Sequence, residues 1–119
     1  MSNLNINEQK IIKDFLAIPI PQYVFDYSDE KFDLLDSYEI AFTFANDLLR
    51  GNSINPSKSP WGDGKSVIFD VEYIQLLTNI KNEKLSEDIS TYCNLFLSVL
   101  NVFKSHLEPS QQSDQSGDG

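Results

Sequence analysis

The chain has 119 residues, of which 40% are hydrophobic and 12% aromatic, and its 18 acidic and 9 basic residues leave a net charge of −9. This length suits one domain, and the apolar content is sufficient for a core, which argues against wholesale disorder. The negative charge argues against direct nucleic-acid binding, because that affinity rests on Lys and Arg side chains that neutralise phosphates. No run of about 18 apolar residues is present, so the sequence predicts no membrane span.

Two further features of the sequence favour a cytoplasmic location. The N-terminal residues show no basic patch followed by an apolar stretch, so no signal peptide is predicted. The single cysteine, Cys93, cannot form an internal disulfide, which fits a reducing compartment.

The first predicted element is a helix over residues 7–18, in which apolar residues recur at three- and four-residue steps. Asn7 is expected to cap it. Pro19 is expected to end it, because the residue before a proline disfavours the helical conformation. The segment that follows, residues 23–27, alternates in an extended style and predicts either a short strand or a buried linker.

The second predicted helix runs from Asp29 to Arg50, with Ser28 as its N-cap and Gly51 as its C-terminal stop. Its apolar residues step by three and four, which places one stripe toward the core. The residues of this predicted stripe are Leu35, Tyr38, Phe42, Ala45 and Leu49.

Beyond Gly51 the chain is rich in turn formers up to about residue 66, and this loop holds the only tryptophan, Trp61. A third helix is expected from Asp70 to Lys81, with Asp70 as its N-cap. A fourth helix is expected, which is capped by Ser86 or begins slightly earlier. Its apolar face continues to Leu107.

The four helices and their mostly short links predict an all-α fold, a small antiparallel four-helix bundle whose two hairpins are joined by the Trp61 loop. The alternative is a small α+β domain in which residues 23–27 and 66–71 pair as strands. In either case residues 1–108 are predicted to form a single domain, and the polar residues 109–119 a disordered tail.

The sequence contains an incomplete phosphate-binding pattern. Residues 64–66 read Gly-Lys-Ser, as at the end of a phosphate-binding loop, but Ser59 stands where the first glycine is needed. Asp63 would add a carboxylate where backbone amides have to meet an anion. These departures predict that the chain binds no nucleotide cofactor.

Other catalytic and metal-binding patterns are also incomplete. Residues 26–37 begin like a calcium-binding loop but do not match it, because Lys31 stands in place of the required glycine and Ser37 in place of the bidentate glutamate. His106 is the only histidine and has no second Cys or His with which to form a zinc site. Cys93 lies on the apolar side of the last helix, as a packed thiol does. The sequence therefore predicts no enzyme activity, no cofactor and no metal.

The second helix carries the most informative surface pattern. On a helical wheel, four of its aspartates fall within a sector of roughly 60° on the side away from the predicted apolar stripe. Ile40 lies inside this sector and Phe44 at its edge, where they are expected to be the apolar anchors of a partner contact. Trp61 either packs against the end of the bundle or contacts the same partner. The aspartates of the predicted acidic face are Asp29, Asp33, Asp36 and Asp47.

An acidic face with apolar anchors favours capture of a basic protein. In size and charge the chain is similar to bacterial immunity proteins as a broad class, which predicts a non-enzymatic inhibitor of a basic toxin such as a nuclease. One alternative is a nucleic-acid mimic or regulatory adaptor of phage or mobile-element origin, which binds a nucleic-acid-processing enzyme. Another is a structural subunit, including a homodimer through Ile40 and Phe44. The simplest alternative is an ordinary solvated helix face.

Overall fold

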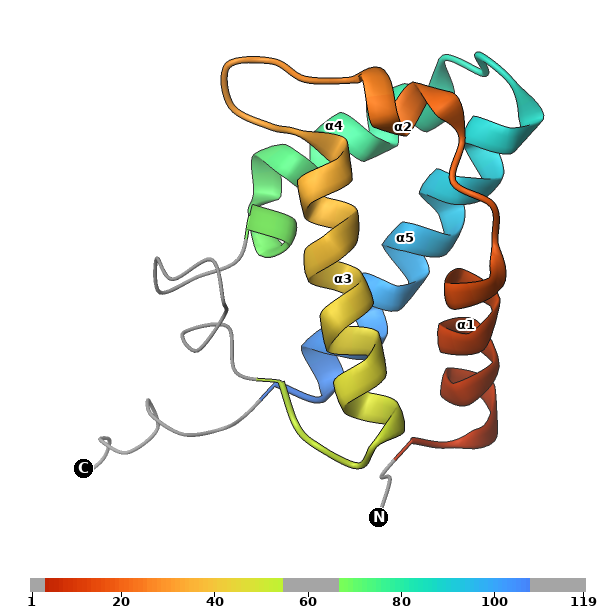
Figure 1. Ribbon diagram of the computed structural model, residues 1–119, viewed down its shortest axis with the longest axis vertical. Helices are drawn as coiled ribbons and strands as arrows, with labels where there is room; N and C mark the ends of the chain where they lie inside the picture. Colours follow the sequence, from red (N-terminus) through yellow and green to blue (C-terminus); the bar gives the residue numbers. More distant parts are fainter. Residues whose placement is uncertain (1–3, 55–66, 108–119) are drawn as a thin grey trace.

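The computed structural model describes residues 4–54 and 67–107, which form five α-helices and a short 3-10 helix (Figure 1). Neither described range contains a β-strand, so the predicted all-α class is confirmed. The α+β alternative is wrong, because most of residues 23–27 belong to a helix and the described part of 66–71 contains no strand. The elements are α1 (Ile6–Ala17), α2 (Gln22–Asp26), α3 (Leu34–Leu49), η2 (Val67–Phe69), α4 (Val71–Asn82) and α5 (Glu87–Ser105).

Helix α5 is the central element of the fold. It packs against α1, α3 and α4. In Figure 1, α1 ascends, α3 and α5 descend, and α4 lies at the upper end of the molecule, where α2 and the α2–α3 loop are also found. The simple four-helix bundle is not confirmed, because α2 is an additional helix where the sequence predicted a strand or a linker.

Aromatic rings from three helices meet in the core. The Phe96 ring of α5 lies 5.7 Å from Phe15 of α1 and 5.9 Å from Tyr73 of α4, both in edge-to-face arrangements. All three side chains are buried. Such pairs stabilise beyond the area that they bury, so this cluster joins both α1 and α4 to α5.

Helix α1 begins two residues earlier than predicted. Asn5, not Asn7, is its N-cap: the Asn5 side chain accepts a hydrogen bond from the Glu8 backbone N–H at 2.8 Å. The Glu8 carboxylate accepts one in return from the Asn5 backbone N–H at 3.1 Å. This reciprocal capping box satisfies two N–H groups, whereas Asn7 offers no such pair. The predicted end is confirmed, because the helix stops at Ala17, before the Ile18–Pro19 step.

Helix α3 begins five residues later than predicted, at Leu34, because Asp29 organises a turn in front of it. One Asp29 carboxylate oxygen accepts hydrogen bonds from the backbone N–H groups of Lys31 and Phe32, at 2.8 and 2.7 Å. The Asp29 backbone N–H donates to the Phe32 carbonyl at 2.9 Å. These local bonds compete with helix formation. The N-cap is therefore Asp33, whose side chain accepts from the Asp36 N–H at 3.1 Å.

The buried face of α3 also differs from the prediction. The residue before each predicted core position is buried, so the centre of the buried face is rotated by about 100° around the helix axis. Phe42 is 44% exposed, whereas Phe44 is 3% exposed and packs its ring 5.9 Å from Phe103 and 6.2 Å from Phe69. Of the predicted stripe, only Ala45 is fully buried. The buried residues of α3 are Leu34, Ser37, Ile40, Ala41, Phe44, Ala45 and Leu48.

The starts of the last two helices are confirmed. The Asp70 side chain accepts from the Glu72 N–H at 2.8 Å, and the Ser86 hydroxyl accepts from the Ile89 N–H at 3.2 Å. Both residues have extended backbone, as N-caps require. Trp61 and the predicted tail at 109–119 lie outside the described residues.

Candidate functional site

The loop between α2 and α3 is organised around Asp29. Besides its two backbone bonds, Asp29 accepts a hydrogen bond from the Tyr27 hydroxyl at 2.8 Å. Hydrogen bonds from the Phe32 backbone, the Tyr27 hydroxyl and the Lys31 backbone lower the pKa of the Asp29 carboxyl. Burial and the neighbouring Asp29 carboxylate raise the pKa of Tyr27 to about 12. Asp29 is thus held ionised, and its position is set by the loop and not by a helix.

This loop is joined to the start of α4 by an ion pair. The Lys31 ammonium donates to the Glu72 carboxylate, although the two residues are 41 positions apart in sequence. The hydrogen bond to Glu72 and the charges of Glu72, Asp70 and Asp29 raise the pKa of Lys31. The ion pair therefore brings two carboxylates to the loop that the sequence analysis did not assign to the site, Asp70 and Glu72.

We call the resulting surface the acidic end. It combines the loop before α3, the first turn of α3 and the first turn of α4, at the upper end of the molecule in Figure 1. Among the described residues, Lys31 is the only base that pairs with it, and it pairs only with Glu72. The acidic end consists of Asp29, Glu30, Asp33, Asp36, Asp70 and Glu72, all exposed except Asp33, which is partly buried.

Three of the predicted partner-binding residues belong to the acidic end, and the others do not. Asp29, Asp33 and Asp36 are brought together there. Asp47 lies near the far end of α3, about 16 Å along the helix from Asp36 at 1.5 Å per residue. There it faces Arg50 at 3.9 Å. The four aspartates therefore do not form one acidic face along α3 as the sequence predicted, because Asp29 lies in the preceding loop and Asp47 lies apart from the other three.

The predicted apolar anchors are buried. Ile40 and Phe44 are 5% and 3% exposed and belong to the core, so neither is available at the surface for a partner. The homodimer through these two residues is wrong for the same reason. The exposed apolar side chain at the acidic end is instead Val71, 68% exposed between Asp70 and Glu72. Its exposure follows from its place at the first position of α4, before the buried face begins at Tyr73.

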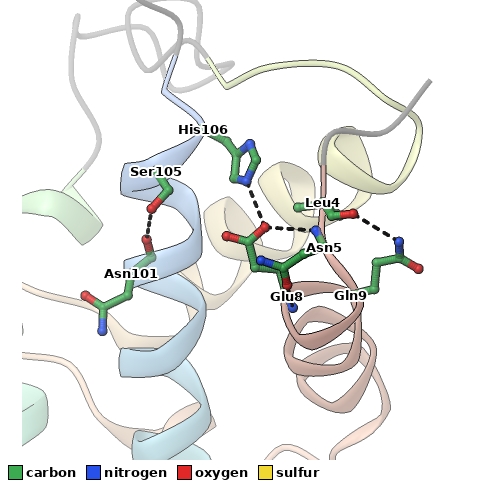
Figure 2. Close-up of polar contacts among 7 residues, drawn as sticks. All are labelled: Leu4, Asn5, Glu8, Gln9, Asn101, Ser105 and His106. Atoms are coloured by element: carbon green, nitrogen blue, oxygen red, sulfur yellow. Dashed lines mark hydrogen bonds and ion pairs between the residues drawn. The ribbon is translucent and has the colours of Figure 1, made fainter.

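A second polar feature joins the start of α1 to the end of α5 (Figure 2). The His106 Nε2 atom lies 3.2 Å from the Glu8 carboxylate, and these side chains are only 16% and 19% exposed. Burial opposes ionisation of Glu8, but the hydrogen bonds from the Asn5 backbone and from His106 outweigh it and lower the Glu8 pKa. The His106 carbonyl also accepts from the Ile54 N–H at 3.2 Å. His106 thus joins the end of α5 to the start of α1 through its side chain and to Ile54 through its carbonyl.

A small cavity of about 190 Å³ adjoins His106. Ser53 and His106 both line it, but no hydrogen bond joins these two side chains. A serine nucleophile requires such contact with its base, so the arrangement lacks the geometry of a Ser–His pair. The cavity is lined by Leu4, Leu48, Gly51, Asn52, Ser53 and His106.

Cys93 is packed in the interior. It is 1% exposed on α5, and burial raises the pKa of its thiol to about 11, although Lys81 acts in the opposite direction. A reactive cysteine has a lowered pKa and solvent access. Cys93 therefore has the properties of a structural residue.

Within residues 4–54 and 67–107, no group of three or more His, Cys, Asp or Glu side chains is arranged to hold a metal ion. None of the helices in these ranges combines the length and apolar character that crossing a membrane requires. In the comparisons with known proteins, no family model, no curated protein and no solved structure matches this chain.

Proposed function

We propose that this chain is a non-enzymatic binding protein whose acidic end captures a basic protein partner, in the manner of an immunity protein that neutralises a toxin. The observation that carries the proposal is the gathering of six carboxylates from a loop and two helix N-termini, of which only Glu72 pairs with a lysine, Lys31. The other five form no ion pair with a described residue.

Uncompensated carboxylates create a negative potential that speeds encounter with a basic surface. Within about 8 Å, the screening length at physiological ionic strength, neighbouring carboxylates act on a partner together. Val71 supplies apolar area among these charges, as the less polar centre of a protein interface does. Because Asp29 and Lys31 are tied to the loop backbone and to α4, respectively, little ordering of this loop is needed on binding.

Charge reversal at two positions tests this proposal. Glu30 and Asp36 are exposed, and neither side chain makes a hydrogen bond to another described residue. Asp33 is a poorer probe, since loss of an N-cap destabilises a helix by about 1 kcal/mol. The variant is therefore Glu30→Lys/Asp36→Lys. The matched control is Asp14→Lys/Asp47→Lys, which changes the net charge equally but lies outside the acidic end.

The wild type and both variants serve as parallel baits for proteins from the source cells, and association with the captured partner is measured at about 50 and 300 mM salt. We expect the acidic-end variant to associate at least about tenfold more slowly at low salt, with the control close to wild type. Equal association rates for the two variants would show that the acidic end does not contribute to capture of the partner.

A second candidate function is mimicry of a nucleic acid. It requires carboxylates on more than one helix, and the acidic end includes the N-termini of both α3 and α4. Competition distinguishes the two candidates. A mimic is displaced from its partner by DNA or RNA, and this displacement weakens with salt. An immunity protein restores growth to cells that produce the toxin, whether or not the toxin acts on nucleic acid.

A further inference from the structure

A groove of about 430 Å³ lies between the linker that joins α1 to α2 and the first turns of α5. None of its lining residues belongs to the acidic end. One side is formed by the four apolar residues 18–21 and by Gln22, and the other side carries Glu87, Asp88 and Thr91 of α5. The groove thus places an apolar strip opposite a pair of carboxylates.

The linker has extended backbone angles at both ends, Ile18 and Pro21, and its backbone polar groups are partly unpaired. Ile18 and Pro21 have ψ angles of 137° and 149°, both in the extended region. Pro19 and Pro21 have no N–H to donate. The Ile20 N–H and C=O form no hydrogen bond with a described residue. An extended backbone with unpaired polar groups is the feature to which another extended chain adds in β-strand pairing.

The carboxylates on the other side are also unpaired. Glu87 and Asp88 are exposed in the first turn of α5, and neither forms an ion pair with a described residue. The closest base in sequence, Lys84, does not pair with them. Their attraction to the α5 dipole accounts for acidic residues at this position, but it leaves their outward charge available to a basic ligand.

We propose that this groove binds an extended segment of a protein partner in which apolar residues alternate with Lys or Arg. Its apolar side chains would pack on Ile18 and Ile20, its backbone would pair with the N–H and C=O of Ile20, and its basic side chains would meet Glu87 and Asp88. Successive side chains of an extended chain point to opposite sides, so an alternating sequence satisfies both walls. This inference does not depend on the acidic end, which shares no residue with the groove.

The probe is a capped synthetic peptide in which valine alternates with lysine over eight residues, titrated into the isotopically labelled full-length chain and followed by amide chemical shifts. Two matched peptides replace either every lysine by glutamate or every valine by serine. Two more carry N-methyl groups on one or the other set of alternate amides, which removes the hydrogen-bond donors of one edge at a time.

We expect saturable shifts centred on Ile20, Asp88 and Thr91, with binding weakened about fivefold to tenfold by Glu87→Gln/Asp88→Asn. Both matched peptides should bind more weakly, and one of the N-methylated peptides should lose binding while the other retains it. Thr91→Arg, which places a bulky cation in the groove, should reduce binding further. Circular dichroism establishes that each variant is folded.

Three results would overturn the proposal. The first is the absence of saturable shifts at the groove, and the second is equal affinity for the lysine and glutamate peptides. The third is shifts confined to the acidic end, around Asp36 and Glu72, which would assign the peptide to that surface. Loss of the groove would leave the acidic-end proposal intact, because Glu30→Lys/Asp36→Lys tests it separately.

Discussion

Replacement of Phe44 by alanine tests which face of α3 forms the core. The Phe44 ring is 3% exposed and contacts the rings of Phe69 and Phe103, from η2 and α5. Truncation of a buried phenylalanine costs about 3–5 kcal/mol, from lost burial and from the cavity that remains. Phe42 is the matched control, since the same substitution two residues earlier removes a ring that is 44% exposed. We expect Phe42→Ala to cost about 1 kcal/mol.

Urea unfolding followed by circular dichroism measures both changes. With a denaturant slope of about 1.5 kcal/mol per M, Phe44→Ala should lower the midpoint by about 2–3 M and Phe42→Ala by less than about 1 M. Domains of this size have a total stability of about 5–15 kcal/mol. The Phe44→Ala variant therefore either keeps a measurable unfolding transition at a lower urea concentration or is unfolded without urea. If Phe42→Ala proved the more damaging substitution, the buried face would be the one predicted from sequence, and the assignment of Ile40 and Phe44 to the core would be refuted.

Three further predictions concern buried and ionised groups. The Tyr92 hydroxyl is buried and has no hydrogen-bond partner among the described residues, so Tyr92→Phe should raise the free energy of unfolding by about 1 kcal/mol or more. Tyr73→Phe, which breaks a bond to the buried Ser37 hydroxyl, should lower it, and equal effects would contradict this contrast. Cys93, with a pKa of about 11 against an ordinary 9.0, should react with a thiol reagent at pH 8 at least about 100-fold more slowly in the native protein than in guanidinium, and comparable rates would contradict its burial. Hydrogen bonds lower the pKa of Asp29 below its ordinary 3.8, so its carboxylate stabilises the fold above that pH and this contribution is lost as the pH falls through the lowered value. Asp29→Asn should therefore be less stable than wild type at pH 6, the difference should shrink below pH 3.8, and a constant difference would exclude the carboxylate as its source.

The site itself was only partly accessible from sequence. Asp29, Asp33 and Asp36 could be singled out because they lie close together in the chain. Asp70 and Glu72 could not be linked to them, because the connection is the ion pair between Lys31 and Glu72, formed across 41 positions. The Glu8–His106 pair spans 98 positions and is inaccessible for the same reason.

What the sequence by itself determined is the all-α class and some of the helix ends, namely the N-caps of α4 and α5 and the end of α1, whereas the predicted caps Asn7 and Ser28 were wrong. Asp70 and Ser86 were identified correctly as N-caps because capping depends on a side chain and an N–H two or three residues away. The end of α1 before Pro19 was equally predictable, since the steric restriction involves only adjacent residues.

Only the tertiary structure decided which face of α3 is buried. Apolar residues cover so wide an arc of this helix that Phe42 and Phe44 were both plausible core positions, and the choice depends on the rings of Phe69 and Phe103 that receive one of them. The start of α3 was decided in a similar way: Asp29 is a good first-turn residue in isolation, but here its side chain closes a turn that Lys31 anchors to α4. Helix periodicity specifies that an apolar face exists, and packing against other segments specifies its direction.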